Sequence, residues 1–219
     1  MSQIHVGCEF EYDTTGETSF LFNVNVSQTD FQRVLSENLT ITPAVFAERL
    51  EIGLERKISQ RCFVRSGGIC LRYDATVELS AEVDFGTTLV EHSYSELPPE
   101  VLPYLNPSRY CESVTLTTFL VRRILKQPPV TYLFKGRACA AIMRTSQLHF
   151  CRGLGIPACY VCGYAAELQP SDFHGFFEAY LGDRWYLFDP TSLAPVSGFV
   201  RIGTGQDAAD VQPNVLLDF

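Results

Sequence analysis

The sequence predicts an α+β protein in two parts: an antiparallel β-sandwich at residues 1–95, then a shortened core at 96–219 in which a helix packs on an antiparallel sheet. Three observations support this. Before residue 95, short segments rich in Val, Phe, Tyr, Thr and Leu follow one another with no helical stretch between them. Later in the chain, a proline-free helical stretch precedes strand-like segments. Residues 93–109 (SYSELPPEVLPYLNPSR) separate the parts with the prolines and turn residues of a linker or domain-edge loop.

The strongest strand pattern in the first part lies at residues 69–80 (ICLRYDATVELS). Its apolar residues alternate with polar ones at a period of two, which is typical of a strand with one buried face. The apolar positions are Leu71, Tyr73, Ala75, Val77 and Leu79. Strands are also predicted at 19–26 (SFLFNVNV) and 62–65, with turns at 15–16 and 66–68. Several short strands without helices favour a sandwich with a structural or substrate-orienting role.

The second part contains the predicted helices and a hairpin. Residues 138–153 (ACAAIMRTSQLHFCRG) carry an apolar stripe at helical spacing, and Gly153 and Gly155 are expected to end that helix. An earlier helix is predicted at 114–126, before a Pro-Pro stop. Residues 156–164 (IPACYVCGY) have the composition of a buried strand. A hairpin then follows, from His174–Leu181 through a Gly-Asp turn into Arg184–Asp189.

The hairpin places a histidine near an aspartate. If the turn has two residues, Leu181 faces Arg184, and His174 and Asp189 become diagonal neighbours on one face. Diagonal pairs lie about 7–8 Å apart at Cα, a gap that these two side chains can close with a hydrogen bond. Such a carboxylate fixes the imidazole tautomer and stabilises the imidazolium. Spacing alone leaves two interpretations: part of a catalytic triad, or a partly exposed histidine and a turn-forming aspartate before Pro190.

Cys139 is the best-placed nucleophile among eight cysteines. It stands where the predicted helix begins, and the unpaired N–H groups and positive dipole end at a helix start favour a thiolate. Cys151 stands near the opposite end, where the dipole disfavours a thiolate. The alternative for Cys139 is a small buried hydrophobic residue, which is the common fate of a free cysteine.

Other cysteine patterns predict packing rather than metal or redox chemistry. Cys159 and Cys162 form a CxxC, but residues i and i+3 of a strand point to opposite faces about 10 Å apart and cannot form a disulfide. The sequence has no second CxxC to complete a zinc site. A mixed site that joins Cys139 or Cys151 to His149 or His174 is a weak alternative. No cofactor and no metal are predicted.

The charge balance narrows the partners. A net charge of −8 disfavours nucleic acid and anionic membrane surfaces. The N-terminus lacks the pattern of a signal peptide, and no apolar run reaches the ~18 residues of a spanning helix. We therefore expect a cytoplasmic protein acting on a peptide or protein substrate, with its oligomeric state open.

A set of ordered motifs carries a family resemblance. In the second part they are Gly136–Cys139, 151–158 (CRGLGIPA), 163–164 (GY), 172–174 (DFH), 177–182 (FEAYLG) and 184–191 (RWYLFDPT). In the first part and the tail they are 6–10 (VGCEF), 71–75 (LRYDA), 107–111 (PSRYC), 202–205 (IGTG) and 207–211 (DAADV). Together they resemble bacterial transglutaminase-like cysteine proteases, in which a β-rich domain precedes the core.

The resemblance implies a papain-like α+β core and a cysteine–histidine–aspartate triad. Carried over to this chain, Cys139 is the nucleophile, His174 the base and Asp189 the residue that orients His174. The thiolate would attack an amide carbonyl and form a thioester, which water or an amine then resolves. Water gives a protease or amidase, whereas a lysine amine gives cross-linking.

Three departures from the family pattern bear on activity. The family places its cysteine twelve residues before the arginine that corresponds to Arg152, and here that position is Ala140. One residue rotates a helical side chain by about 100°, unless an irregular first turn absorbs it. The stretch between Cys111 and Cys139 is also short, and Gly175 replaces a usual tryptophan. Two hypotheses therefore stand: a thiol hydrolase or acyltransferase, and a catalytically inactive binding module with Ala140 in the nucleophile's place.

Overall fold

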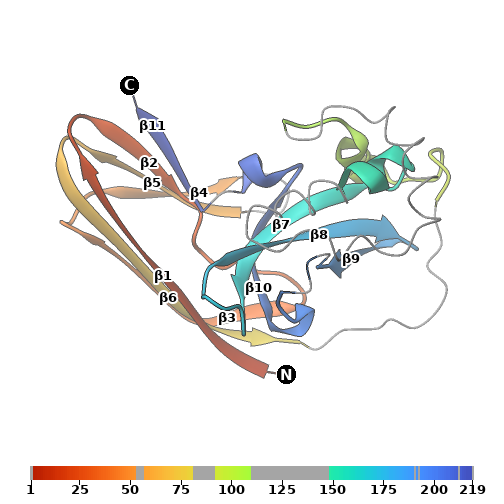
Figure 1. Ribbon diagram of the computed structural model, residues 1–219, viewed down its shortest axis with the longest axis horizontal. Coiled ribbons are helices and arrows are strands. Elements are labelled where there is room, and N and C mark those ends of the chain that lie inside the picture. Colours follow the sequence, from red (N-terminus) through yellow and green to blue (C-terminus); the bar gives the residue numbers. More distant parts are fainter. Residues whose placement is uncertain are drawn as a thin grey trace.

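The computed structural model describes residues 2–52, 57–80, 92–109, 148–189, 191, 193–211 and 213–218. These residues form three antiparallel sheets, ordered β1-β6-β3, β11-β2-β5-β4 and β10-β7-β8-β9 (Figure 1). The strands of the first two sheets are β1 (Ser2–Thr14), β2 (Thr18–Phe22), β3 (Gln32–Thr42), β4 (Ala47–Ile52), β5 (Lys57–Val64), β6 (Gly67–Leu79) and β11 (Asn214–Asp218). Those of the third are β7 (Ala158–Ala165), β8 (Phe173–Leu181), β9 (Arg184–Phe188) and β10 (Phe199–Gly205).

The first two sheets pack face to face, which confirms the predicted antiparallel β-sandwich. Along β6, the five apolar residues predicted to face inward are all buried. They meet Phe20 and Phe22 of β2 in one apolar cluster. β1, β3 and β4 were not among the predicted strands, although Val6, Cys8 and Phe10 alternate with polar residues along β1.

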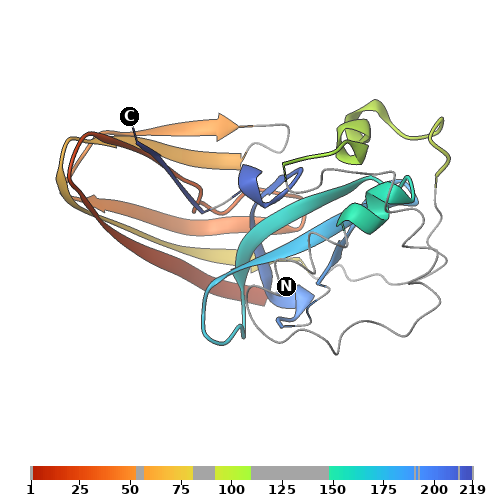
Figure 2. The same ribbon diagram turned by 45° about the horizontal axis from the view of Figure 1, so that its top comes forward.

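The last described strand of the chain returns to the sandwich. β11 pairs with β2 from Asn214↔Phe22 to Asp218↔Thr18, so it extends the sheet at the opposite end of the sequence (Figure 2). The division of the chain at residue 95 remains a prediction. Its second part needs one adjustment, because residues 214–218 belong to a sandwich sheet and not to the core.

The third sheet contains the predicted hairpin with the predicted register. β8 and β9 pair from Leu181↔Arg184 to Phe177↔Phe188. Gly182 and Asp183 both have positive φ, 53° and 65°, as a type I′ two-residue turn requires. This turn type matches the twist of the strands and therefore fixes which residues of β8 and β9 share a face.

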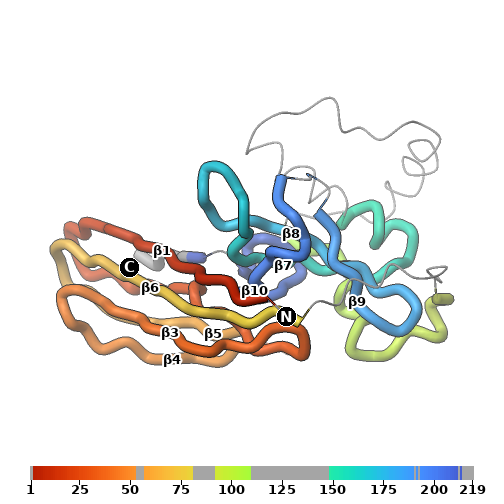
Figure 3. Tube along the Cα trace, turned by 90° about the horizontal axis from the view of Figure 1, so that it is seen from below, coloured from red at the N-terminus to blue at the C-terminus, as the bar shows by residue number. Residues whose placement is uncertain are grey.

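Apolar contacts join the third sheet to the sandwich. Tyr164, Val200 and Ile202 belong to the same buried cluster as the sandwich core. The Tyr164 hydroxyl donates to the Val24 carbonyl at 2.8 Å, and the ring of Phe173 stacks on Phe10 with centroids 5.9 Å apart. Figure 3 shows the sandwich on one side and β7 to β10 on the other, in contact along this junction.

Gln32 closes the free edge of β10. Its side-chain amide donates to the Arg201 carbonyl at 2.8 Å and accepts from the Arg201 N–H at 2.9 Å, as a neighbouring strand would. It also donates to the Ser27 carbonyl at 2.6 Å, and it is buried. The start of β3 therefore holds the third sheet in place through a single side chain.

We expect Gln32→Ala to lower the free energy of unfolding by about 2–4 kcal/mol, because it leaves three buried backbone groups without partners. Gln32→Glu keeps the acceptor but loses the amide donor, so it should also be destabilising. Urea unfolding followed by circular dichroism would measure both. Gln3→Ala, at an exposed position, is the matched control and should change stability by less than about 0.5 kcal/mol. Equal stability of Gln32→Ala and wild type would show that the two parts are held together by apolar contacts alone.

The predicted helix at 138–153 is described only at its end, as helical residues 148–153. Gly155 has φ 82°, and the Ile156 and Gly155 amides donate to the Cys151 and Arg152 carbonyls, which is a Schellman motif. Gly155 thus ends the helix as predicted. Leu148 is fully buried in a cluster with Phe177 and Ala179 of β8. The rest of this helix, and the helix predicted at 114–126, lie outside the described residues.

The segment predicted as a linker is a short helix docked on the third sheet. Residues Pro99–Leu105 form the 3-10 helix η1, and Val101 and Leu105 pack with Tyr180 of β8. Tyr104 meets the ring of Trp185 edge-on, with centroids 5.2 Å apart. Its prolines stop a longer helix, while its apolar residues give it a fixed position. No helix in the described part of the chain combines the length and the apolar character needed to cross a membrane.

Candidate functional site

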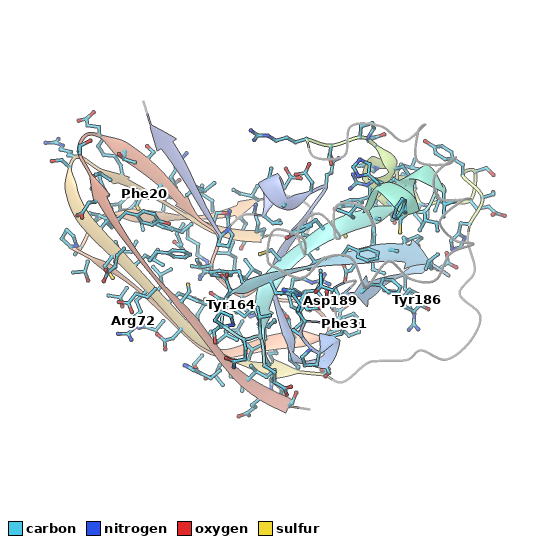
Figure 4. The ribbon with its side chains drawn as sticks, in the orientation of Figure 1. Phe20, Phe31, Arg72, Tyr164, Tyr186 and Asp189 are labelled. Atoms are coloured by element: carbon cyan, nitrogen blue, oxygen red, sulfur yellow. The ribbon has the colours of Figure 1, made fainter. Side chains whose placement is uncertain are left out.

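His174 and Asp189 form a hydrogen-bonded pair on the β8–β9 hairpin. His174 is the second residue of β8, and Asp189 directly follows β9. The His174 Nε2 and Asp189 Oδ2 atoms lie 3.0 Å apart, and the two side chains are only 4% and 2% exposed. Figure 4 labels Asp189 beside β8, with Tyr186 farther along the hairpin. The structure therefore brings together the two hairpin residues singled out from the sequence.

Thr191 fixes the other oxygen of the same carboxylate. Its backbone N–H and its hydroxyl donate to Asp189 Oδ1 at 2.9 and 2.6 Å. The hydroxyl also lies 3.4 Å from His174 Nε2. Thr191 was not predicted as a site residue, but a threonine two residues after an aspartate is a sequence signal for this local turn. Asp189 cannot rotate without breaking bonds to two neighbours.

These contacts keep Asp189 ionised. Burial on its own would raise the pKa of the carboxyl, but hydrogen bonds from His174 and Thr191 outweigh burial and lower the pKa to about 2. The carboxylate is therefore negative throughout the neutral range. A negative charge at Nε2 stabilises a proton on the ring and favours the imidazolium over the neutral imidazole.

The pair leaves one ring nitrogen for chemistry. Asp189 occupies Nε2, so Nδ1 is the atom that could take or give a proton. Within the described ranges, no residue forms a hydrogen bond with Nδ1. Phe176 meets the imidazole edge-on at 4.8 Å between centroids, and Phe199 packs behind Phe176. The ring is thus held at a fixed orientation by apolar contacts as well as by Asp189.

Gly163 supports the ring from the next strand. It lies opposite His174 in the β7–β8 ladder. A Cβ at this position would collide with the Val200 carbonyl and the ring of Phe199. The close approach of β10 and Phe199 behind His174 therefore requires glycine here.

The low pKa of Asp189 makes a signed prediction for stability against pH. Because the folded pKa of about 2 lies below the usual 3.8, the pair stabilises the fold above pH 4 and loses this contribution as pH falls towards 2. We expect a loss of about 1–2 kcal/mol across this window. Urea midpoints at several values between pH 5 and 2.5 would measure it, as the difference between wild type and Asp189→Asn. If the two curves ran parallel, Asp189 would not be the ionised partner of His174.

The proposed nucleophile lies outside the described residues. Cys139 and Ala140 both fall within the undescribed range 110–147. The described end of the helix packs on Phe177 and Ala179, which alternate with His174 along β8. Leu148 therefore touches the face of the sheet opposite to the His174 side chain. A thiol from earlier in this helix would have to reach His174 around the end of the sheet.

The other predicted alternatives are resolved by position. Cys159 and Cys162 are free and buried, and they belong to different clusters on opposite faces of the sheet, as the packing interpretation predicts. In the part of the chain that the structure describes, the only side chains close enough to share a metal ion are Glu9, Glu11 and Cys70, in the sandwich. His174, Cys151 and His149 are not part of that group. The weak mixed Cys/His site is thus not assembled from the described residues.

A shallow depression of about 360 Å³ borders Asp189. Its described lining is Glu167, Asp189, Leu193, Ala194, Pro195 and Val196. The sequence offered no signal for it, because the turn after β7 and the segment after β9 are brought together only by the fold. It provides a concave surface next to the histidine–aspartate pair.

Comparisons with known proteins agree with this architecture. Residues 2–98 match the family described as the bacterial transglutaminase N-terminal domain, and residues 119–190 match the transglutaminase-like superfamily. The crystal structure of a candidate cysteine protease from Cytophaga hutchinsonii is similar, with a TM-score of 0.81 and 27% identity. The match covers 99% of this chain and 85% of that chain. The curated proteins gave no match. The chain thus belongs to the transglutaminase-like superfamily, as a β-sandwich domain joined to a transglutaminase-like core.

Proposed function

We propose that this protein is a thiol enzyme that cleaves or transfers amide acyl groups of a peptide or protein through a thioester. Cys139 is the nucleophile, His174 is the general base and acid through Nδ1, and Asp189 holds His174 through Nε2. The observation that supports this most is the buried 3.0 Å contact between His174 and the ionised Asp189. A paired and oriented imidazole is the part of a triad that is hardest to explain by packing alone.

The chemistry follows in two steps. The Cys139 thiolate attacks the amide carbonyl carbon, and His174 Nδ1–H gives its proton to the departing amine as the C–N bond breaks. Water or a primary amine then attacks the thioester, and Nδ1 takes the proton from this attacking group. The C–S bond breaks, the product acid or amide leaves, and the thiolate–imidazolium pair is restored.

The second hypothesis is a catalytically inactive binding module on the same fold. Two observations favour it: the residue twelve positions before Arg152 is Ala140, and the described end of the helix lies on the sheet face away from His174. In this case the histidine–aspartate pair would serve only to stiffen the hairpin.

Thiol labelling separates the two hypotheses. Limiting iodoacetamide near pH 6, followed by peptide mapping, should modify Cys139 faster than every other cysteine in the native protein. His174→Ala should abolish this preference, since the thiolate loses its imidazolium partner. The matched control is His5→Ala, which replaces an exposed histidine in β1 and should leave the labelling pattern unchanged. Slow labelling that is independent of His174 would support the binding module and reject the triad.

A further inference from the structure

One carboxylate in the depression beside Asp189 is available to a ligand. The Asp189 carboxylate is already bonded to His174 and Thr191. Glu167 is exposed and forms no hydrogen bond or ion pair with any described residue. Its position is nevertheless defined, because the preceding Ala166 N–H donates to the Gly198 carbonyl at 2.9 Å. The site thus presents a single negative side chain at a fixed turn.

The opposite wall of the depression is apolar. Residues 193–196 (LAPV) contribute only hydrocarbon side chains, and Leu193 is 51% exposed. An exposed leucine next to a free carboxylate offers methylene contacts at one end and charge pairing at the other. A long aliphatic chain with a cationic end has the matching distribution of apolar and charged groups.

We propose that this depression binds a lysine-type group, an aliphatic chain ending in a primary ammonium, with its methylenes against Leu193 and Pro195 and its charge at Glu167. This inference rests on the proposed function and names the substrate class of the same site. The net charge of −8 favours the approach of a cationic group, and the two carboxylates at the depression repel an anionic one. The ammonium could belong to a lysine of the acylated peptide or to the amine that resolves the thioester.

Binding should be measured apart from turnover, in full-length Cys139→Ala. The probes are N-acetyl-Gly-Lys-Gly-amide, its norleucine counterpart, and n-butylamine, each titrated at low salt with NMR shifts of the Glu167 and Leu193 amides as the readout. We expect the lysine peptide to bind roughly two- to fivefold tighter than the norleucine peptide, as suits a partly exposed charge pair. Glu167→Gln should remove this preference. Glu17→Gln, which removes one exposed carboxylate on the sandwich, should keep it.

The arms distinguish the two sources. If n-butylamine displaces the lysine peptide, the ammonium and its methylenes suffice, and an acceptor amine is supported. If only the peptide binds, the lysine belongs to the acyl donor. Equal affinities of the lysine and norleucine peptides, or a preference that survives Glu167→Gln, would overturn the proposal. A clear lysine preference combined with slow, His174-independent labelling of Cys139 would reject the catalytic function but leave the lysine site standing.

Discussion

Asp189→Asn should lower kcat/KM for an amide substrate by about 10³–10⁴-fold while the protein stays folded. Comparable losses follow when a triad aspartate is exchanged for its amide. In this chain the cause is specific: an Asn amide cannot supply the negative charge that stabilises the His174 imidazolium, and it can present its NH₂ to Nε2 and so favour the wrong tautomer. The Thr191 contacts to the retained side-chain oxygen should keep the turn in place.

The measurement is a hydrolysis or amine-incorporation assay on a glutamine- or amide-containing peptide, with kcat and KM resolved separately. The loss should fall on kcat, because Asp189 acts through His174 and does not bind the substrate. Asp13→Asn makes the same exchange at an exposed position at the end of β1 and is the matched control. A wild-type rate in Asp189→Asn would show that the pair is structural and would leave the binding module as the better hypothesis.

The sequence determined the histidine–aspartate pair because every step of that argument is local. A two-residue Gly-Asp turn has few backbone solutions, and it sets the register of both strands that leave it. Once Leu181 faces Arg184, the faces of His174 and Asp189 follow from the two-residue period of a strand. The strand at β6 was predictable for the same reason, since its alternation lies within one segment.

The features that escaped prediction depend on contacts between distant segments. Gln32 contacts Arg201 across 169 residues, and β11 joins β2 from the other end of the chain. The depression needs Glu167 and Leu193 to meet over the top of the sheet. None of these leaves a periodic or local pattern, because a polar side chain at a strand start or a glutamate in a turn has an ordinary solvent-exposed interpretation.

Arg152→Lys should lower the free energy of unfolding by about 3 kcal/mol, although it keeps the charge. Arg152 is 1% exposed, and its guanidinium donates to the carbonyls of Asn106, Ala158 and Gln206. It also reaches the Ser108 hydroxyl at 3.2 Å. A planar fork can donate to separate segments at once, whereas the lysine ammonium is a compact donor that cannot span them. Each unmet buried bond to a charged donor is worth about 1.5–3 kcal/mol.

Thermal and urea unfolding would measure this loss, with a fall in Tm of roughly 6–12 °C for a chain of this size. Arg33→Lys is the matched control, because Arg33 is 69% exposed and pairs with Glu78 on the sandwich surface, where an ion pair is worth less than about 1 kcal/mol. A loss below 1 kcal/mol in Arg152→Lys would mean that water satisfies the carbonyls, and that the guanidinium does not hold these segments together.

The double variant tests whether Arg152 and the histidine–aspartate pair are independent. Arg152 acts at Ala158, which faces Ala179 in the β7–β8 ladder, five residues along β8 from His174. At strand spacing this separation is roughly 17 Å, beyond the range at which stability effects usually couple. The losses from Arg152→Lys and Asp189→Asn should therefore add to within about 0.5 kcal/mol at pH 7. An interaction energy above 1 kcal/mol would show that the guanidinium positions the hairpin as well as the helix end, and Arg152 would then become a positioning residue for His174.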